Sequence, residues 1–300
     1  MIISVLIFTI ILLTLICVAG MLRQYRHQLK QTLSFRLKCK LLASGVFAFI
    51  ADTIGIGSFA VGIACAKFFN TFDDDELPPM VNGAQIIPGA LESLFFMQII
   101  QVDLKTLLTL VLGTCIGGLL GGHLVSRLSK QAIRLLMLCC FTSIICLILG
   151  NQLHILPIGG DLTALASWRL FFGFIGMILC GALTSAGIGL FAMVQGVLFL
   201  LNVSPAVAFP IMTTAGAMQQ PLTTLMFLKQ GKIPLHKTFF ISLGGCVGVL
   251  MVMPIFPYLN ADYLHHLLIG ILLFNLYRIS KAYIADKRLE QLSIDELCEV

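Results

Sequence analysis

Two carboxyl groups, those of Asp52 and Glu92, lie deep inside long apolar stretches of the sequence. At the centre of a bilayer a charged carboxylate costs about 2.5–3.5 kcal/mol even on the lenient insertion scale, so it normally faces a cavity or a partner. Desolvation favours the neutral acid, and an acid that gains and loses a proton can carry that proton. The sequence therefore predicts proton coupling through this pair, preferably through Asp52. A permanently protonated acid, hydrogen-bonded within the protein, is the alternative.

Glycines interrupt the apolar stretch around Asp52 and a second stretch further along the chain. The four that match at an offset of 132 residues are Gly55, Gly57, Gly187 and Gly189. Their segments, 43–69 and 169–201, are longer than one perpendicular membrane crossing requires. A break in each helix would free backbone N–H groups at the positive end of the next half-helix, where an anion can bind. We therefore expect the glycines and Ser58 to bind a small oxyanion, with close helix packing as the alternative.

Amide and hydroxyl side chains lie in corresponding apolar regions of the two halves. They are Asn82, Gln85, Thr213, Thr214, Gln219 and Gln220. Such groups can donate hydrogen bonds to an oxyanion and cost less to bury than charges do. Pro88, Pro210 and Pro221 should kink the helices nearby. These residues are interpreted as the lining of a polar pocket, although hydrogen bonds between helices would also explain them.

The composition sets the fold class. Apolar residues make up 58% of the 300 residues and charged residues 11%, with a mean hydropathy of +1.00, which indicates an all-α, polytopic membrane bundle. About nine apolar runs are long enough to cross roughly 30 Å of hydrocarbon as helices. They are 1–20, 43–69, 80–98, 104–125, 132–149, 169–201, 206–228, 238–257 and 263–280.

Basic residues follow the first run, from Arg23 to Lys40. The positive-inside rule places this cluster on the cytoplasmic side of the membrane. We expect that membrane to be the plasma (inner) membrane. Nine single crossings then leave the N-terminus outside and the C-terminus in the cytoplasm. The same threading puts the acidic connection 73–76 outside, together with the basic connection 127–134, which conflicts with the rule.

Internal similarity extends beyond the matched glycines. VLGTCIGG at 111–118 recurs as SLGGCVGV at 242–249, and Pro88 matches Pro221. Glycines spaced by four residues in the first of these runs predict close helix packing. We interpret the chain as two four-helix repeats in the same orientation. The expected units are an N-terminal anchor (1–20), a basic cytoplasmic linker (21–42), repeat 1 (43–150), a connection (151–167), repeat 2 (168–283) and a cytoplasmic tail (284–300).

A family resemblance rests on these motifs. IADTIGIGS at 50–58, SAGIGLFA at 185–192 and AFPIMTTAGAMQQP at 208–221 resemble the TauE/SafE sulfite exporter family of anion permeases. The similarity covers about residues 43–283. It implies a permease for sulfite, another sulfur oxyanion or an organosulfonate. A richer glycine motif is common in that family, and IGIGS is a reduced version of it.

The predicted function is secondary active transport of a small anion by alternating access, with proton coupling. The sequence contains no Walker motif, nucleic-acid motif or recognisable catalytic or metal spacing, so we expect no enzyme activity, no cofactor and no metal site. The expected partners are the anion and the lipid bilayer, and a homo-oligomer is left open. A cation or metal carrier that uses Asp52 and Glu92 is the main alternative, and an intramembrane enzyme is a weaker one.

Overall fold

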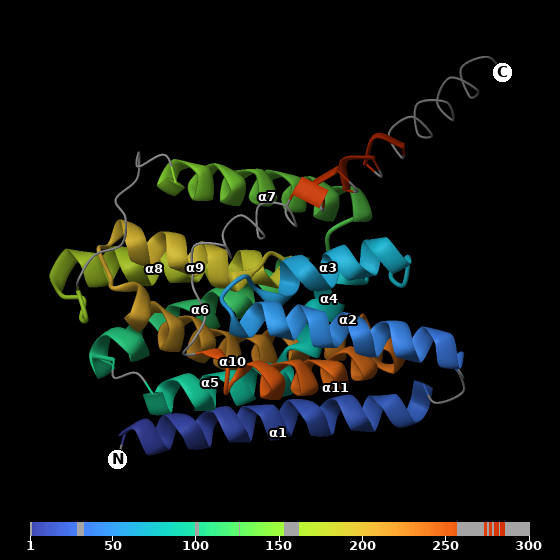
Figure 1. Cartoon of the computed structure of the whole chain (residues 1–300), viewed down its shortest axis with the longest axis horizontal. Helices are drawn as coiled ribbons and strands as arrows, with labels where there is room; N and C mark the ends of the chain where they lie inside the picture. Colours follow the sequence, from blue (N-terminus) through green and yellow to red (C-terminus); the bar gives the residue numbers. More distant parts are fainter. Residues whose placement is uncertain are drawn as a thin grey trace.

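The protein is an all-helical bundle (Figure 1). The computed structural model describes residues 2–28, 33–99, 102–125, 127–152 and 162–256, and 273–274, 276–277, 279–281 and 283–285. Its named helices are α1 (Ile2–Gln28), α2 (Phe35–Thr53), α3 (Ser58–Phe69), α4 (Leu77–Ala84), α5 (Ile86–Ile99), α6 (Leu104–Val125), α7 (Lys130–Gln152), α8 (Ser167–Ser185), α9 (Leu190–Leu200), α10 (Pro205–Lys229) and α11 (Leu235–Val252). This confirms the predicted all-α class.

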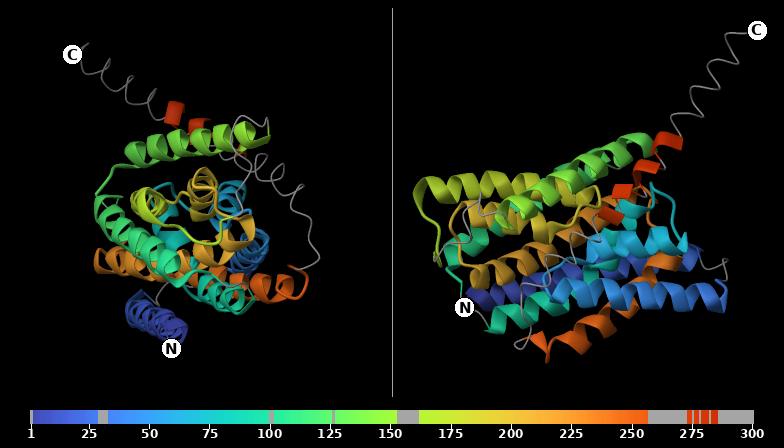
Figure 2. Two further views of the ribbon diagram at one scale, coloured as in Figure 1. Left: turned by 90° about the vertical axis from the view of Figure 1, so that its left-hand side faces the viewer. Right: turned by 45° about the horizontal axis from the view of Figure 1, so that its top comes forward.

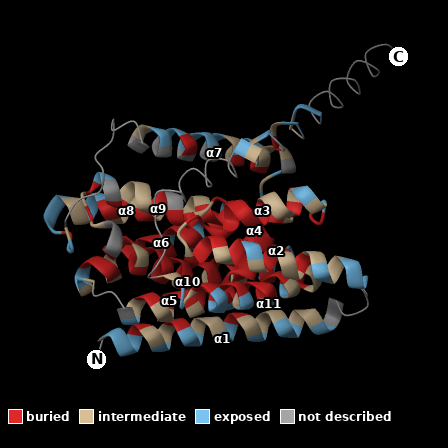
Figure 3. Ribbon diagram, in the orientation of Figure 1, coloured by how far each residue is buried: buried red, intermediate tan, exposed pale blue. Residues whose placement is uncertain are grey.

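Four of the described helices are long and apolar enough to cross a membrane by themselves. They are formed by Ile3–Arg26, Leu104–Val125, Ser167–Ser185 and Leu235–Val252. Buried residues concentrate in the middle of the bundle (Figure 3). The outer helices α1 and α7 lie on opposite sides of the bundle when it is viewed along its long axis (Figure 2). Apolar side chains on the outer surface, such as Phe8 and Leu120, are suited to contact with lipid.

The two long glycine-containing segments fold back on themselves instead of crossing once. The Lys40 ammonium, just before the start of segment 43–69, lies 5.5 Å from the centre of the ring of Phe69, the last residue of that segment. In the second segment, 169–201, Gly173 lies near the start and Leu201 at the end. A Cβ added at Gly173 would nevertheless lie only 3.1 Å from Leu201 Cδ1. Each segment is therefore a helical hairpin: hairpin 1 comprises α2 and α3, and hairpin 2 comprises α8 and α9.

The two hairpins enter the bundle from opposite ends (Figure 1). Helix α2 runs parallel to α11, because Gly244 packs against Leu42 and Gly248 against Val46. Helix α8 runs parallel to α6 through matching contacts, such as Gly117 against Ile178. The predicted orientation of the two units is therefore wrong. Hairpin 1 and α11 start at one end of the bundle, whereas hairpin 2 and α6 start at the other, so the matched segments run in opposite directions.

Glycines make these helix contacts possible. A Cβ at Gly117 would overlap the carbonyl oxygen of Ile178, and one at Gly244 would overlap that of Leu42. The backbones approach so closely because no side chain separates them. Close packing was predicted for the glycine run on α6 and is confirmed at Gly113, Gly117, Gly118, Gly121 and Gly122.

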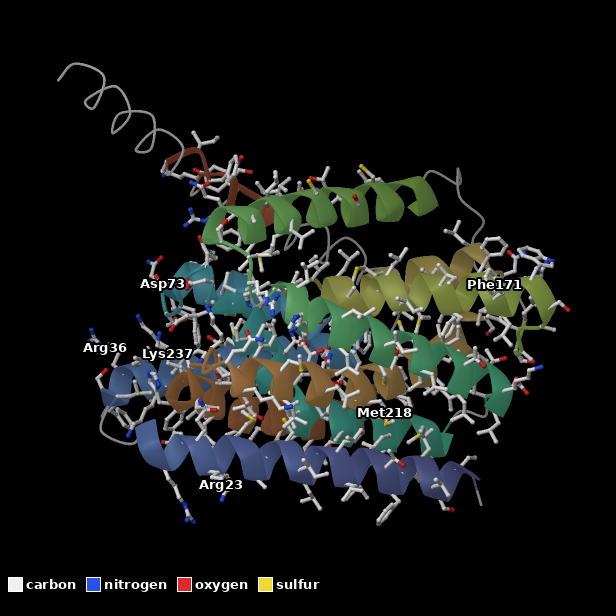
Figure 4. The ribbon with its side chains drawn as sticks, turned by 180° about the vertical axis from the view of Figure 1, so that it is seen from behind. Arg23, Arg36, Asp73, Phe171, Met218 and Lys237 are labelled. Carbon is white, nitrogen blue, oxygen red and sulfur yellow. The ribbon has the colours of Figure 1, made fainter. Side chains whose placement is uncertain are left out.

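Basic residues gather at one end of the bundle, which we call the basic end. Figure 4 shows Arg23, Arg36 and Lys237 there, and Phe171 at the opposite end. The connection at 127–134 also lies at the basic end, because Arg134 forms an ion pair with Asp74. The predicted topology put Arg23 on one side of the membrane and the connections 73–76 and 127–134 on the other. The structure places all of them at the same end, so this prediction is wrong. Hairpin 1 returns to the end from which it started, and this removes the earlier conflict with the charge rule.

Several predicted boundaries differ from the observed helices. Most of the predicted linker 21–42 is helical, since α1 continues to Gln28 and α2 begins at Phe35. Long basic side chains can extend helices beyond the apolar region by reaching towards water. Most of the predicted run 263–280, the tail 284–300 and the connection 151–167 lies outside the described residues.

An N-terminal cap anchors α6 at the end opposite the basic end. The backbone N–H and the hydroxyl of Thr106 donate to the Asp103 carboxylate at 2.9 and 2.7 Å. The Thr106 hydroxyl oxygen also accepts a bond from the backbone N–H of Leu165 at 2.9 Å, which ties α6 to the segment before α8. The Thr106 hydrogen bonds lower the pKa of Asp103.

Replacement of Asp103 with Ala should therefore lower the unfolding free energy by about 1 kcal/mol at neutral pH. A carboxylate with a lowered pKa stabilises the fold above its unfolded pKa, and that contribution is lost as the pH falls through the folded value. The difference between the two proteins should thus shrink below about pH 4. Thermal unfolding in detergent at several pH values would measure it. Asp103→Asn, which keeps a capping side chain, is the control, and equal losses in both variants would contradict the cap.

Candidate functional site

The tips of the two hairpins meet in the buried middle of the bundle. A Cβ added at Gly57 would lie 3.7 Å from Phe191 Cβ. A Cβ added at Gly189 would lie 3.8 Å from Phe59 Cβ. The two phenylalanines are in the first turns of α9 and α3. These paired contacts bring the N-termini of α3 and α9 together. Their positive dipole ends therefore act on the same region of the protein.

The predicted helix breaks are confirmed at both tips. Helix α2 ends at Thr53 and α3 begins at Ser58, while α8 ends at Ser185 and α9 begins at Leu190. Gly57 has a φ of +100° and Gly187 a φ of +88°, values that residues with side chains rarely adopt. The chain can therefore reverse its direction within four residues at each tip.

Asp52 occupies the N-terminus of α3. Its carboxylate accepts a hydrogen bond from the backbone N–H of Ser58 at 2.6 Å and another from the Gln85 amide. The Ser58 hydroxyl donates to the Gln85 oxygen at 2.5 Å, which closes a ring of hydrogen bonds through Asp52, Ser58 and Gln85. All three residues are at most 5% exposed. The sequence predicted a free amide for an anion here, whereas a carboxyl group of the protein itself occupies that place.

Glu92 lies next to this ring. The Thr53 hydroxyl donates to Glu92 Oε1 at 2.7 Å, and Glu92 Oε2 is buried without a hydrogen-bond partner among the described residues. The Glu92 and Asp52 carboxyl groups are close enough to interact. Two neighbouring buried carboxyl groups cannot both be ionised without a large cost, so the pair is suited to holding a proton.

Hydroxyl and amide groups form the corresponding region of hairpin 2. Gln219 donates to the Thr223 hydroxyl oxygen at 2.6 Å, and the Ser185 hydroxyl donates to the Gly118 carbonyl at 3.0 Å. At the offset of 132 residues, Asp52 corresponds to Thr184, whose hydroxyl donates to its own helix at the Cys180 carbonyl. The two tips thus differ chemically, because only hairpin 1 has an acid at this position.

Further buried hydrogen bonds connect the halves. The Asn82 amide donates to the Thr184 carbonyl at the end of α8, at 3.1 Å. The Ser93 hydroxyl on α5 donates to the Thr214 hydroxyl oxygen on α10 at 3.3 Å. Both bonds are buried. A movement of hairpin 2 relative to α4 would have to break or replace the Asn82–Thr184 bond, and a movement of α10 relative to α5 would have to break or replace the Ser93–Thr214 bond.

The predicted site residues are brought together only in part. Asp52, Ser58, Gln85 and Glu92 form one cluster, and Gln219 lies with the hydroxyls of hairpin 2. The Thr213 hydroxyl donates to the Phe209 carbonyl of its own helix. The side-chain oxygens of Asn82, Gln219 and Gln220 are buried without partners among the described residues.

Sequence reasoning missed four buried hydroxyl residues of this region. They are Thr53, Thr184, Ser185 and Thr223, each fully buried or nearly so. The signal was present for three of them. The pair Asp52–Thr53 precedes the first glycines as Thr184–Ser185 precedes the second, at the same offset of 132 residues.

Comparisons with protein-family models, curated proteins and solved structures found no significant match for the chain. The chemistry of the site must therefore be inferred from its own residues. Within the described part of the chain, no three His, Cys, Asp or Glu side chains come together as a metal site would require. The arrangement can hold a proton on the Asp52–Glu92 pair, and it can direct two helix N-termini at one ligand.

Proposed function

We propose that the protein is a secondary carrier for a small anion and that it couples the movement of the anion to a proton. The meeting of the α3 and α9 N-termini at the buried tips is the observation that carries this proposal. Two positive dipole ends at one point favour negative charge between them, and the Ser58 amide needs an acceptor that lipid cannot supply once Asp52 is protonated. An anion between the tips satisfies both requirements.

Asp52 supplies the coupling in this proposal. In its charged form the carboxylate competes with a substrate anion for the Ser58 amide, since it already accepts that hydrogen bond. Protonation removes the negative charge and weakens the hold of Asp52 on the helix end. The substrate anion then takes its place, so that proton and anion bind together. Glu92 is the adjacent group that can exchange the proton with Asp52.

An inverted duplication would account for alternating access. The matched glycine motifs pack in matched ways, with Gly113 against Phe174 and Gly244 against Leu42. Inverted repeats allow two conformations in which the halves exchange their arrangements and expose the site to opposite sides. The basic end is assigned to the cytoplasm of the plasma (inner) membrane by the charge rule, which leaves the N-terminus outside and the C-terminus inside.

Sulfur oxyanions and organosulfonates are proposed as substrates from the TauE/SafE resemblance alone. The cation carrier is the second candidate. It is favoured by the paired carboxyl groups and by the unpartnered oxygens of Asn82, Gln219 and Gln220. Two facing helix N-termini oppose a cation, however, and we therefore prefer the anion.

Uptake by proteoliposomes tests this proposal. Vesicles containing the purified protein should accumulate sulfite or an alkylsulfonate when the outside is made acidic, whereas empty vesicles should not. Divalent cations should be neither accumulated nor able to compete. A substitution at Leu120, which is 63% exposed, is the control for reconstitution. Uptake of a divalent cation without any anion flux would replace the anion proposal by the cation carrier.

A further inference from the structure

A second polar site lies at the basic end, away from the hairpin tips. It is a cavity of about 740 Å³. Its walls come from the end of α3, the connection to α4, the starts of α7 and α11, and the C-terminal helical segment near Lys281. A ligand in this cavity would touch parts of the chain that are far apart in sequence.

The charges around the cavity leave an excess of positive charge. The buried Asp74 carboxylate, which is 4% exposed, forms ion pairs with both Lys67 and Arg134. The cavity is lined by four basic side chains and three acidic ones. Lys237 forms an ion pair with Glu76 at 3.1 Å, and this pair has no net charge. Lys281 adds a further positive charge, and among the described residues it has no ion-pair partner.

Thr71 provides an independent sign of a ligand. Its side chain is 9% exposed and lines the cavity, yet its hydroxyl is buried without a hydrogen-bond partner among the described residues. A buried hydroxyl without a partner costs about 1–3 kcal/mol, so a ligand acceptor would remove that cost. The acidic residue Asp73 also lines the cavity, but its side chain is exposed to solvent, where its charge is screened.

We propose that this cavity binds a phosphate group in its dianionic form. Phosphate oxygens can accept hydrogen bonds from the Thr71 hydroxyl and from ammonium and guanidinium groups at the same time. The bound group would join hairpin 1, α7 and the C-terminal segment, and would stabilise the arrangement seen here. The volume admits either free phosphate or the headgroup of a phospholipid. This site is separate from the proposed carrier site and does not depend on it.

Thermal unfolding of the purified full-length protein in a non-ionic detergent provides the test. Sodium phosphate should raise the melting temperature in a saturable way compared with sodium chloride of equal ionic strength. Lys281→Gln and Thr71→Val should each weaken the apparent affinity for phosphate, the former about tenfold, because a charged contact is lost. Lys105→Gln, a change of an exposed lysine at the opposite end, should leave the affinity unchanged.

Bilayer nanodiscs distinguish the two sources of the phosphate group. If a lipid supplies it, phosphatidic acid should stabilise the protein relative to phosphatidylcholine, and Lys281→Gln should remove that difference, even where free phosphate has no effect. The proposal is overturned if neither form stabilises the protein, or if both stabilise the two cavity variants as much as the wild type. Glu92→Gln should retain the phosphate response, so that failure of the carrier proposal can be recognised separately.

Discussion

Substitution of Asp52 by Asn is expected to uncouple anion flux from the proton gradient. In the wild type, coupling to one proton allows each unit of pH difference, worth about 1.4 kcal/mol, to support about tenfold accumulation of the anion. Asparagine can still accept a hydrogen bond from the Ser58 amide, but it cannot take up a proton. The variant should therefore equilibrate the anion at best, without accumulating it.

Proteoliposome uptake at several imposed pH differences measures this effect. The slope of accumulation against pH difference should fall to zero in Asp52→Asn and remain in Asp103→Asn, whose acid is exposed near the end of the bundle. Glu92→Gln separates the two acids of the pair. If Asp52→Asn keeps the full slope and Glu92→Gln loses it, Glu92 is the proton carrier and the assigned role of Asp52 is wrong.

The second large effect is expected from alanine at Gly117 or Gly244. The added methyl group would overlap a backbone carbonyl oxygen, that of Ile178 or that of Leu42, and backbone cannot rotate away as a side chain can. The helices would have to separate. Overpacking of this kind costs about 1–3 kcal/mol, so each variant should unfold at a clearly lower temperature than the wild type.

Gly20→Ala is the matched control. A Cβ at this glycine of α1 would be 3.5 Å from Leu228 Cδ1, an ordinary contact with a side chain. Alanine is also the better helix former, by roughly 0.5–1 kcal/mol. Its stability should therefore be equal to or higher than that of the wild type in the same thermal or denaturant unfolding experiment. Similar losses at Gly20 and Gly117 would mean that close backbone approach does not explain the role of these glycines.

The sequence predicted the helical class, the packing role of the α6 glycines and the positions of both helix breaks. It did not predict that the chain folds back after each break. A segment of this length can either cross at a tilt or form a hairpin, since both bury the same apolar residues. The decision depends on contacts between distant residues, such as Lys40 with Phe69, which no local pattern contains.

The candidate site was predictable to a similar extent. Buried polar groups in apolar stretches are conspicuous, and Asp52, Gln85 and Glu92 were found in that way. Serine and threonine are less conspicuous, because their hydroxyls can be satisfied within their own helix, as that of Thr184 is. The bond from the Ser58 amide to Asp52 depends on the turn between them, so it could be seen only once the conformation of Gly57 was known.

The chemical difference between Asp52 and Thr184 has a consequence for the energetics of a transport cycle. With an acid at only one of the two tips, a cycle has a single place where a proton can accompany the substrate. One proton moving with one monovalent anion transfers no net charge across the bilayer. Such a cycle would be electrically silent, so the membrane voltage would neither drive nor oppose it, and the pH difference alone would supply the work.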